Sequence, residues 1–141
     1  MYGEAVIVFN QSLFTNDGDP LKYRHKQVMQ LASKQRFIAV QFLALLKNDL
    51  WKKSTEHSNA MARLLKTRLE PFAEYIRFTK PVETNGLFFE IPRHWYEPLS
   101  TVFPFYMWKI KTSEIRLMCS FDTTENDIDL FVNKIRELIQ Q

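Results

Sequence analysis

Residues 105–120 read FYMWKIKTSEIRLMCS. Two apolar segments, Phe105–Ile110 and Glu114–Ser120, are separated by three residues. Segments of this kind predict two β-strands, and so short a connection favours antiparallel pairing. Side chains alternate between the faces of a strand, so either Phe105 and Met107 or Tyr106 and Trp108 face the core. For Tyr106 and Trp108 we favour packing in the core; the alternative is that they line a channel.

The flanking sequence extends this pattern in both directions. We predict further strands at 75–78 and 86–91, a short helix over 93–100, and a last helix that begins near 122–125. Thr124 and Asp127 have the spacing of a capping box. The apolar face of the last helix follows an i, i+3, i+4, i+7 series, namely Ile128, Phe131, Val132, Ile135, Leu138 and Ile139.

Two long helices are predicted before these elements. The turn cluster 16–20, in which Asp19 caps and Pro20 begins the helix, precedes helical spacing to about Lys47. Residues 37–46 are apolar nearly all round, which predicts burial. A second helix over 50–69 ends before Pro71, with Trp51, Ser54, His57, Met61, Leu64, Leu65 and Arg68 on one side. The fold class is therefore α+β, with a small, mostly antiparallel sheet covered by helices.

The chain begins with an unusual strand. Residues 5–9, AVIVF, predict a strand buried on both faces, as in a parallel sheet, yet no hydrophobic strand follows soon after. We therefore expect that an upstream half is missing and that the fragment exposes apolar surface at 5–9. Such surface drives self-association.

Composition sets further limits. A chain of 141 residues fits one domain, and a net charge of +3 is too small to indicate nucleic-acid binding. Cys119 is the single cysteine, so an intrachain disulfide and a four-cysteine zinc site are impossible, and we expect a cytoplasmic protein without a metal site. No apolar run approaches the roughly 20 residues of a membrane span.

Several segments in one order resemble the low-specificity threonine aldolases of the β-eliminating lyase family. The helix segment HSNAMA resembles their H-x-N-A-M-A motif, and PVETN, FYMW and IRLMCSFDTT resemble three later motifs. GEAV resembles their strand after the cofactor lysine, and the basic segment from Lys26 to Phe37 resembles one of their helices. These matches lie at 57–62, 81–85, 105–108, 115–124, 3–6 and 26–37.

The resemblance implies the C-terminal part of a fold-type-I pyridoxal-phosphate enzyme that cleaves β-hydroxy-α-amino acids such as threonine into glycine and an aldehyde. In the family the Schiff-base lysine precedes the GEAV strand, so this chain has no catalytic residue of its own and we expect it to be inactive and cofactor-free alone. The resemblance also implies that residues 1–48 end the large domain and 49–141 form the small domain.

Arg116 is the main site candidate, because a charge in mid-strand is costly unless it is paired. From spacing alone, an exposed arginine paired with an acid is the commoner case. The resemblance implies instead that Arg116 binds the substrate α-carboxylate through two parallel hydrogen bonds. It also implies that Lys26 and Lys34 reach a cofactor phosphate or a subunit interface, whereas a solvated basic helix face explains them equally well.

Other residues have structural interpretations. We expect His57 to be buried and locally hydrogen-bonded, Asn85 to shape the start of a strand, and Cys119 to be a small buried apolar residue. The alternative function is a non-enzymatic α+β module that binds a protein partner or itself. Substrate preference does not follow from this sequence. We expect a homo-oligomer that acts on a small amino acid.

Overall fold

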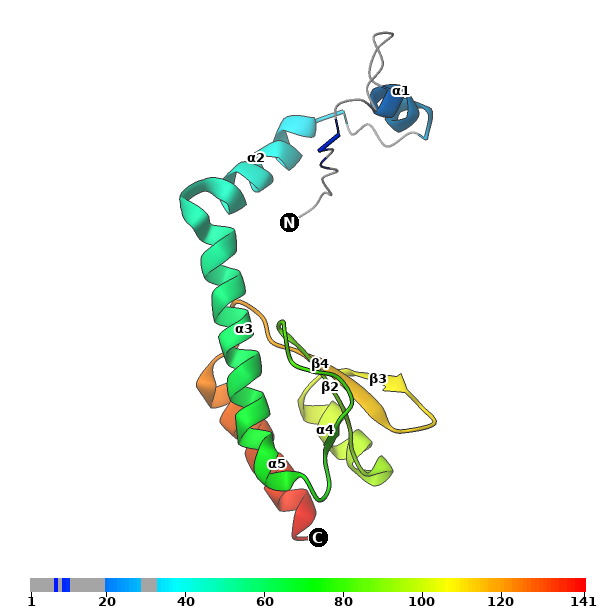
Figure 1. Cartoon of the computed structure of the whole chain (residues 1–141), viewed down its shortest axis with the longest axis vertical. Helices are drawn as coiled ribbons and strands as arrows, with labels where there is room; N and C mark the ends of the chain where they lie inside the picture. Colours follow the sequence, from blue (N-terminus) through cyan, green and yellow to red (C-terminus); the bar gives the residue numbers. More distant parts are fainter. Residues whose placement is uncertain (1–6, 8, 11–19, 29–32) are drawn as a thin grey trace. The chain divides into compact units, whose positions relative to one another are not determined.

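The computed structural model describes residues 7, 9–10, 20–28 and 33–141. The chain divides into two compact units, Met1–Leu50 and Trp51–Gln141. Figure 1 shows the elements of each unit, coloured along the sequence. The predicted turn at 16–19 lies outside the described residues. The GEAV segment at 3–6, on which part of the family resemblance rests, also lies outside them.

The described residues of the first unit form two α-helices where the sequence predicts one. Helix α1 spans Pro20–Gln27 and helix α2 spans Gln35–Leu46, with Ser33 and Lys34 in a turn before α2. The prediction of one helix to Lys47 is therefore wrong. Helices are stabilised mainly by packing of an apolar face, and residues 23–27 of α1 are all exposed. Helical spacing of apolar residues was therefore not enough to predict one continuous helix.

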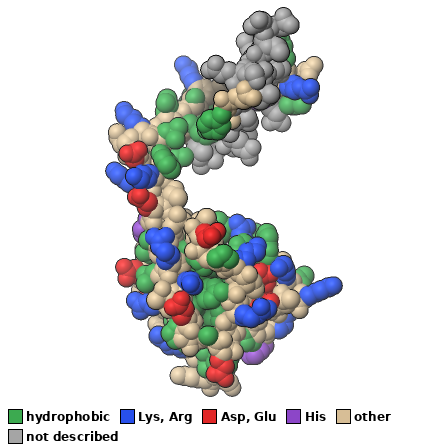
Figure 2. Space-filling model, in the orientation of Figure 1, with side chains coloured by type: hydrophobic (Ala, Val, Ile, Leu, Met, Phe, Trp, Pro, Cys, Tyr) green, Lys and Arg blue, Asp and Glu red, His purple; other side chains and the backbone are tan. Residues whose placement is uncertain are grey.

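Helix α2 is exposed, contrary to the predicted burial of residues 37–46. None of its residues is buried, and Phe37, Val40, Leu43 and Leu46 are all more than half exposed. Figure 2 shows hydrophobic side chains at the surface over α2. The prediction assumed a covering surface, and the described residues of the first unit do not supply one. The exposed side of α2 is therefore a candidate contact surface.

The strand predicted at 5–9 lies largely outside the described residues. Ile7 and Phe9, which are described, have no regular secondary structure and are 72% and 93% exposed. At the other end of the unit, α2 is followed by the short 3₁₀ helix η2, Lys47–Asp49. Asn48 and Asp49 both have a φ of 56°, so the backbone turns sharply before the next helix.

The second unit is built on a four-stranded antiparallel sheet, as predicted. Its strands are β1 (Arg77–Phe78), β2 (Gly86–Glu90), β3 (Tyr106–Lys109) and β4 (Glu114–Met118). They lie in the order β1-β2-β4-β3, and every neighbouring pair is antiparallel. The two central strands place Leu87, Phe89 and Ile115 toward the core, which leaves the alternate residues on the opposite face, here called the outer face.

Helix α3 spans Leu50–Leu69, as predicted, but its buried face differs from the prediction. The 3₁₀ helix η3, Glu70–Phe72, follows it. Of the residues on the predicted face, only Leu65 is buried. The other buried residues of α3 are Ser58, Ala62 and Leu69, which lie outside that face. The prediction favoured large side chains, whereas small residues let α3 approach the rest of the core closely. Trp51 is left 46% exposed.

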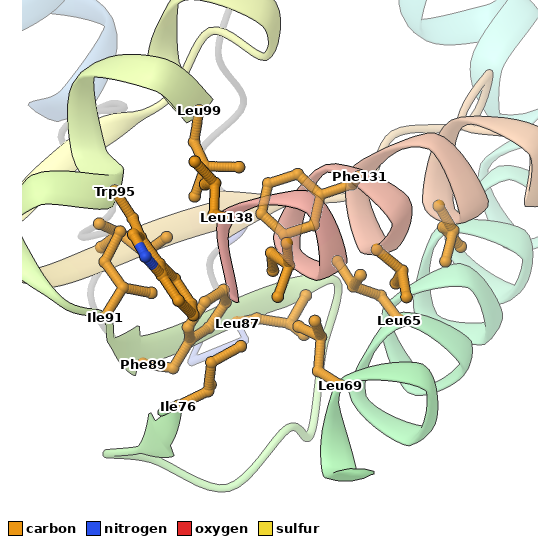
Figure 3. Packing of buried hydrophobic residues seen from close by; sticks show 14 of the residues in the cluster. Leu65, Leu69, Ile76, Leu87, Phe89, Ile91, Trp95, Leu99, Phe131 and Leu138 are labelled. Carbon is orange, nitrogen blue, oxygen red and sulfur yellow. The ribbon is translucent and has the colours of Figure 1, made fainter. Parts of the chain in front are cut away.

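Helix α5, Glu125–Ile139, completes the core beside α3 (Figure 1). Its predicted capping box is present, because the Thr124 hydroxyl accepts from the Asp127 N–H and the Asp127 carboxylate accepts from the Thr124 N–H. Five of the six predicted face residues are buried, and Ile139 packs at the edge. Phe131 and Leu138 of α5 belong to the same core cluster as Leu69 and Leu87 (Figure 3).

A shorter helical segment closes the end of the core. It comprises the 3₁₀ helix η4, Arg93–Trp95, and helix α4, Tyr96–Val102, where the sequence predicts a helix over 93–100. Trp95 and Leu99 point into the cluster (Figure 3). The second unit therefore has a continuous core on one face of its sheet.

Candidate functional site

Arg116 lies in the middle of β4, on the outer face of the sheet. It stands directly opposite Phe88 on β2 and Tyr106 on β3, so the three residues form one row across the sheet. Its neighbours in β4, Ile115 and Leu117, point to the other face and contribute to the core. The strand therefore fixes the Arg116 backbone rigidly and presents its side chain away from the core.

The guanidinium of Arg116 has no acidic partner among the described residues. Its Nη2 lies 2.6 Å from Met118 Sδ, and its Cζ lies 5.5 Å from the ring centroid of Trp108. Arg77 on the same sheet is different, because it forms an ion pair with Glu90. An exposed arginine paired with a nearby acid is thus not what the described residues show for Arg116.

Aromatic side chains surround Arg116 on the outer face. The rings of Phe88 and Trp108 meet edge to face, with centroids 5.5 Å apart. Lys80 Nζ lies 4.0 Å from the Phe88 centroid and 5.7 Å from that of Trp108. Cations are attracted to the faces of aromatic rings, so two positive groups share one aromatic pair.

Tyr106 and Trp108 do not pack in the core, contrary to prediction. They are 81% and 47% exposed, whereas Phe105 and Met107 pack against the core cluster. The pairing of β3 with β4 shifts between Met107 and Lys109, so Trp108 occupies a β-bulge. Tyr106 precedes this bulge and already faces outward, because it pairs with Arg116 on the outer face. The prediction therefore assigned the wrong one of the two alternating pairs to the core.

Glu114 is a buried charge that sequence reasoning missed. It is 1% exposed and accepts a hydrogen bond from the Thr79 hydroxyl. Its Oε2 lies 2.8 Å from Lys109 Nζ. The bonds from Lys109 and Thr79 hold the pKa of this carboxyl below its ordinary value of 4.5. Glu114 is therefore a charged anchor of the hairpin, and its negative charge is matched by Lys109 instead of Arg116.

A cleft of about 390 Å³ lies beside Arg116, where the end of β4 meets the start of β3 and of α5. Its lining is mainly apolar and includes Phe103, Pro104 and Phe105 as well as Tyr106 and Arg116. Asp127 is the carboxylate among its lining residues, and hydrogen bonds from Thr124 hold its pKa below the ordinary value. Because the capping box occupies that carboxylate, Arg116 is the group in this cleft that is available to an anion.

A second cleft, of about 420 Å³, lies between α3 and the end of β4. Its lining residues are Ser54, Thr55, Ser58, Asn59, Asn85 and 118–121. Asn85 Nδ2 donates to the Cys119 carbonyl at 2.8 Å and the Cys119 N–H donates to the Asn85 carbonyl at 2.9 Å. Asn85 thus fixes the start of β2, as predicted. Among the described residues, no lysine lines either cleft.

The remaining candidates lie elsewhere. His57 is exposed instead of buried, and its Nε2 donates to the Thr123 carbonyl at 2.8 Å, which ties α3 to the start of α5. Cys119 is buried, as predicted, and burial raises the pKa of its thiol. Lys26 is exposed in the last turn of α1 and Lys34 is exposed before α2. Both belong to the first unit.

Two general features of the described residues also bear on function. The described residues contain no group of three histidine, cysteine, aspartate or glutamate side chains placed to hold a metal ion. No helix in the described ranges has the length and apolar character needed to cross a membrane.

Sequence relatives and a solved structure confirm the family resemblance. No family model matches the chain. The low specificity L-threonine aldolase of Pseudomonas aeruginosa is 35% identical over 137 residues, which are 96% of this chain and 36% of that protein. The low specificity L-threonine aldolase of a Pseudomonas species is 33% identical over 138 residues, 97% of this chain and 38% of that protein.

Comparison of the fold with solved structures supports the same family. The structure of the threonine aldolase of Leishmania major matches with a TM-score of 0.76 and 29% identity, over 85% of this chain and 35% of that one. The chain thus spans little more than a third of the proteins it matches. In sequence and in fold it corresponds to the C-terminal part of the low-specificity threonine aldolases.

Proposed function

We propose that this chain is the C-terminal part of a cytoplasmic pyridoxal-phosphate lyase that cleaves β-hydroxy-α-amino acids, and that Arg116 binds the substrate α-carboxylate. The observation that supports this most strongly is the state of Arg116. It is a half-buried arginine in mid-strand that lines a cleft and has no acidic partner among the described residues. A cation left unmatched in this way is suited to an anionic ligand.

The geometry of the guanidinium suits a carboxylate. Arginine presents its donors in a planar fork that matches two carboxylate oxygens. Its Nη2 lies 2.6 Å from Met118 Sδ, and this weak acceptor does not neutralise the charge. A carboxylate bound in this way would fix the orientation of the amino acid, which is how a binding residue contributes to the alignment of a reacting bond.

The described residues of this chain do not fit the cofactor itself. Pyridoxal phosphate requires a lysine in its pocket, and neither cleft has one among its described lining residues. We therefore propose that the cofactor is held by the part of the relatives that this chain does not span. The chain alone is then inactive and contributes substrate binding.

The first unit suits an interface. Its α2 exposes Phe37, Val40, Leu43 and Leu46, and Lys26 and Lys34 are exposed nearby in the sequence. We propose that residues 1–48 end the large domain, that 49–141 form the small domain, and that α2 is covered in a homo-oligomer. In this arrangement Lys26 and Lys34 lie at the subunit interface or reach a cofactor phosphate.

A fusion protein tests the proposed activity. The chain replaces the matched region of the Pseudomonas aeruginosa relative, and threonine-dependent acetaldehyde formation is measured. We expect the fusion to be active and the 141-residue chain alone to be inactive. A folded fusion that binds the cofactor but does not cleave threonine would contradict the proposal.

Variants of the fusion test the role of Arg116. Losing the charge-assisted pair costs about 1.5–3 kcal/mol, so Arg116→Ala should lower kcat/KM roughly 10- to 150-fold. Arg77→Ala is the matched control, because it removes a strand arginine that is already paired with Glu90. Equal kcat/KM in the Arg116 variant and the control would reject the carboxylate clamp.

A further inference from the structure

Trp108 contacts the guanidinium that the proposed function depends on. The Arg116 Cζ lies 5.5 Å from the Trp108 ring centroid, within the range of a cation–π interaction. Trp108 is 47% exposed and is not part of the core cluster. Its ring therefore covers another side chain on the outer face instead of filling the core.

The backbone explains why this ring reaches Arg116. The direct partner of Arg116 on β3 is Tyr106, and Trp108 lies two residues further along. The register shift between Met107 and Lys109 places Trp108 in a bulge. Bulges redirect side chains and are common beside functional sites. Here the bulge leaves Lys109 opposite Glu114, its ion-pair partner, while the Trp108 ring lies against Arg116.

Trp108 is itself held in place. Phe88 meets it edge to face at 5.5 Å, and Lys80 Nζ lies 5.7 Å from its centroid. Phe88 is also directly opposite Arg116 across β2 and β4. The ring is thus supported on the same strand pair that carries the arginine, so its position relative to the guanidinium is well defined.

We propose that Trp108 is a positioning residue for Arg116, which holds the guanidinium against its ring so that the donor fork is oriented before a carboxylate arrives. This inference rests on the proposed carboxylate-binding role of Arg116. An arginine on a flexible stem loses conformational freedom when it binds, and an arginine held by a cation–π contact has already lost part of it. Unlike an acid, the ring orders the side chain and leaves its charge unmatched.

The test is an NMR measurement of the Arg116 Nε–H group in the 141-residue chain, with the signal assigned by its loss in Arg116→Lys. We expect an ordered Nε–H that is shifted by the ring current of Trp108. The shift should persist in part in Trp108→Phe and disappear in Trp108→Leu. Trp51→Leu is the matched control, because Trp51 has nearly the same exposure, 46%, and lies on α3.

A mobile, unshifted Arg116 Nε–H in the unmodified chain would overturn the inference, and this outcome does not depend on how any variant folds. A signal unchanged in a folded Trp108→Leu variant would overturn it as well. Phe88→Leu, which keeps the indole but removes its support, should reduce the shift. That second variant tests the same arrangement without removing Trp108.

An acetate titration of the same signal separates the inference from the function on which it rests. We expect acetate to shift the Arg116 Nε–H, and its affinity to fall about 2- to 5-fold in Trp108→Leu, the effect of losing an exposed cation–π contact. Equal affinity in the two proteins would overturn the inference. If the signal is ordered by Trp108 but acetate has no effect, the carboxylate clamp is rejected while the positioning by Trp108 stands.

Discussion

Lys109 and Glu114 stand opposite each other at the closed end of the β3–β4 hairpin, and the Lys109 Nζ lies 2.8 Å from the Glu114 Oε2. The acid is buried and the lysine is 58% exposed. Thr79, from the segment after β1, donates its hydroxyl to the same carboxylate. The pair therefore connects the hairpin to the far edge of the sheet, on the face that carries Arg116.

Removing the lysine should destabilise the second unit. In Lys109→Met the buried Glu114 keeps its charge but loses its cation, and an unsatisfied buried group costs about 1–3 kcal/mol. Urea unfolding followed by circular dichroism measures this loss. Lys134→Met is the control, because it breaks an exposed pair with Glu137 that contributes at most about 1 kcal/mol. Equal losses in both variants would show that the Glu114 pair has no special role.

The same carboxylate predicts a pH dependence. The pKa of Glu114 is lowered in the folded state, so its stabilising contribution is present above the unfolded value of 4.5 and is lost as the pH falls through the folded pKa. Glu114→Gln should therefore be less stable than the unmodified chain near neutral pH. The difference should shrink below pH 4.5.

Urea unfolding at several pH values measures this difference. Glu137→Gln removes an exposed carboxylate and serves as the control. The expected trend for Glu114 is contradicted if the difference between Glu114→Gln and the unmodified chain stays constant, or grows, as the solution is acidified.

The hairpin turn offers a stabilising substitution. Ser113 has a φ of 54°, in the left-handed region that costs a residue with a Cβ about 1–2 kcal/mol. Ser113→Gly should raise the free energy of unfolding by up to about 1 kcal/mol. Ser100→Gly in α4 is the control and should lower it by about 0.5–1 kcal/mol, because glycine weakens a helix interior. Thermal unfolding distinguishes these opposite signs.

The parts of the fold that follow from local rules could be predicted from the sequence. The four strands lie between turn signals, and the capping box of α5 depends on two residues, Thr124 and Asp127, three positions apart. The α3 face was misjudged because burial of Ser58 and Ala62 depends on how closely α3 approaches the core. Periodicity reports large apolar side chains and does not measure that distance.

The candidate site was predicted only in part. Arg116 could be recognised as a charge in mid-strand, but its surroundings could not. The position of Trp108 depends on a bulge, and the burial of Glu114 depends on Thr79 and Lys109, which pairing of distant segments brings together. Register is set by the whole sheet, and alternation alone does not say which pair of β3 side chains, Phe105 and Met107 or Tyr106 and Trp108, faces the core.

The exposed side of α2 predicts self-association. Burying a Leu, Val or Phe side chain fully contributes about 1.5–3 kcal/mol, and Phe37, Val40, Leu43 and Leu46 are each more than half exposed. Covering them in a second copy should therefore contribute several kcal/mol. We expect the chain to form a dimer or larger species in sedimentation experiments, and Leu43→Glu should shift it toward the monomer.

A matched variant makes this expectation specific to the apolar side of α2. Gln35→Glu adds a negative charge at the start of the same helix without replacing a large apolar side chain. It should leave the sedimentation profile unchanged, because no apolar contact is lost. A chain that stays monomeric at high concentration would reject the interface, and so would an oligomer that Leu43→Glu and Gln35→Glu affect equally, since charge and not burial would then control association.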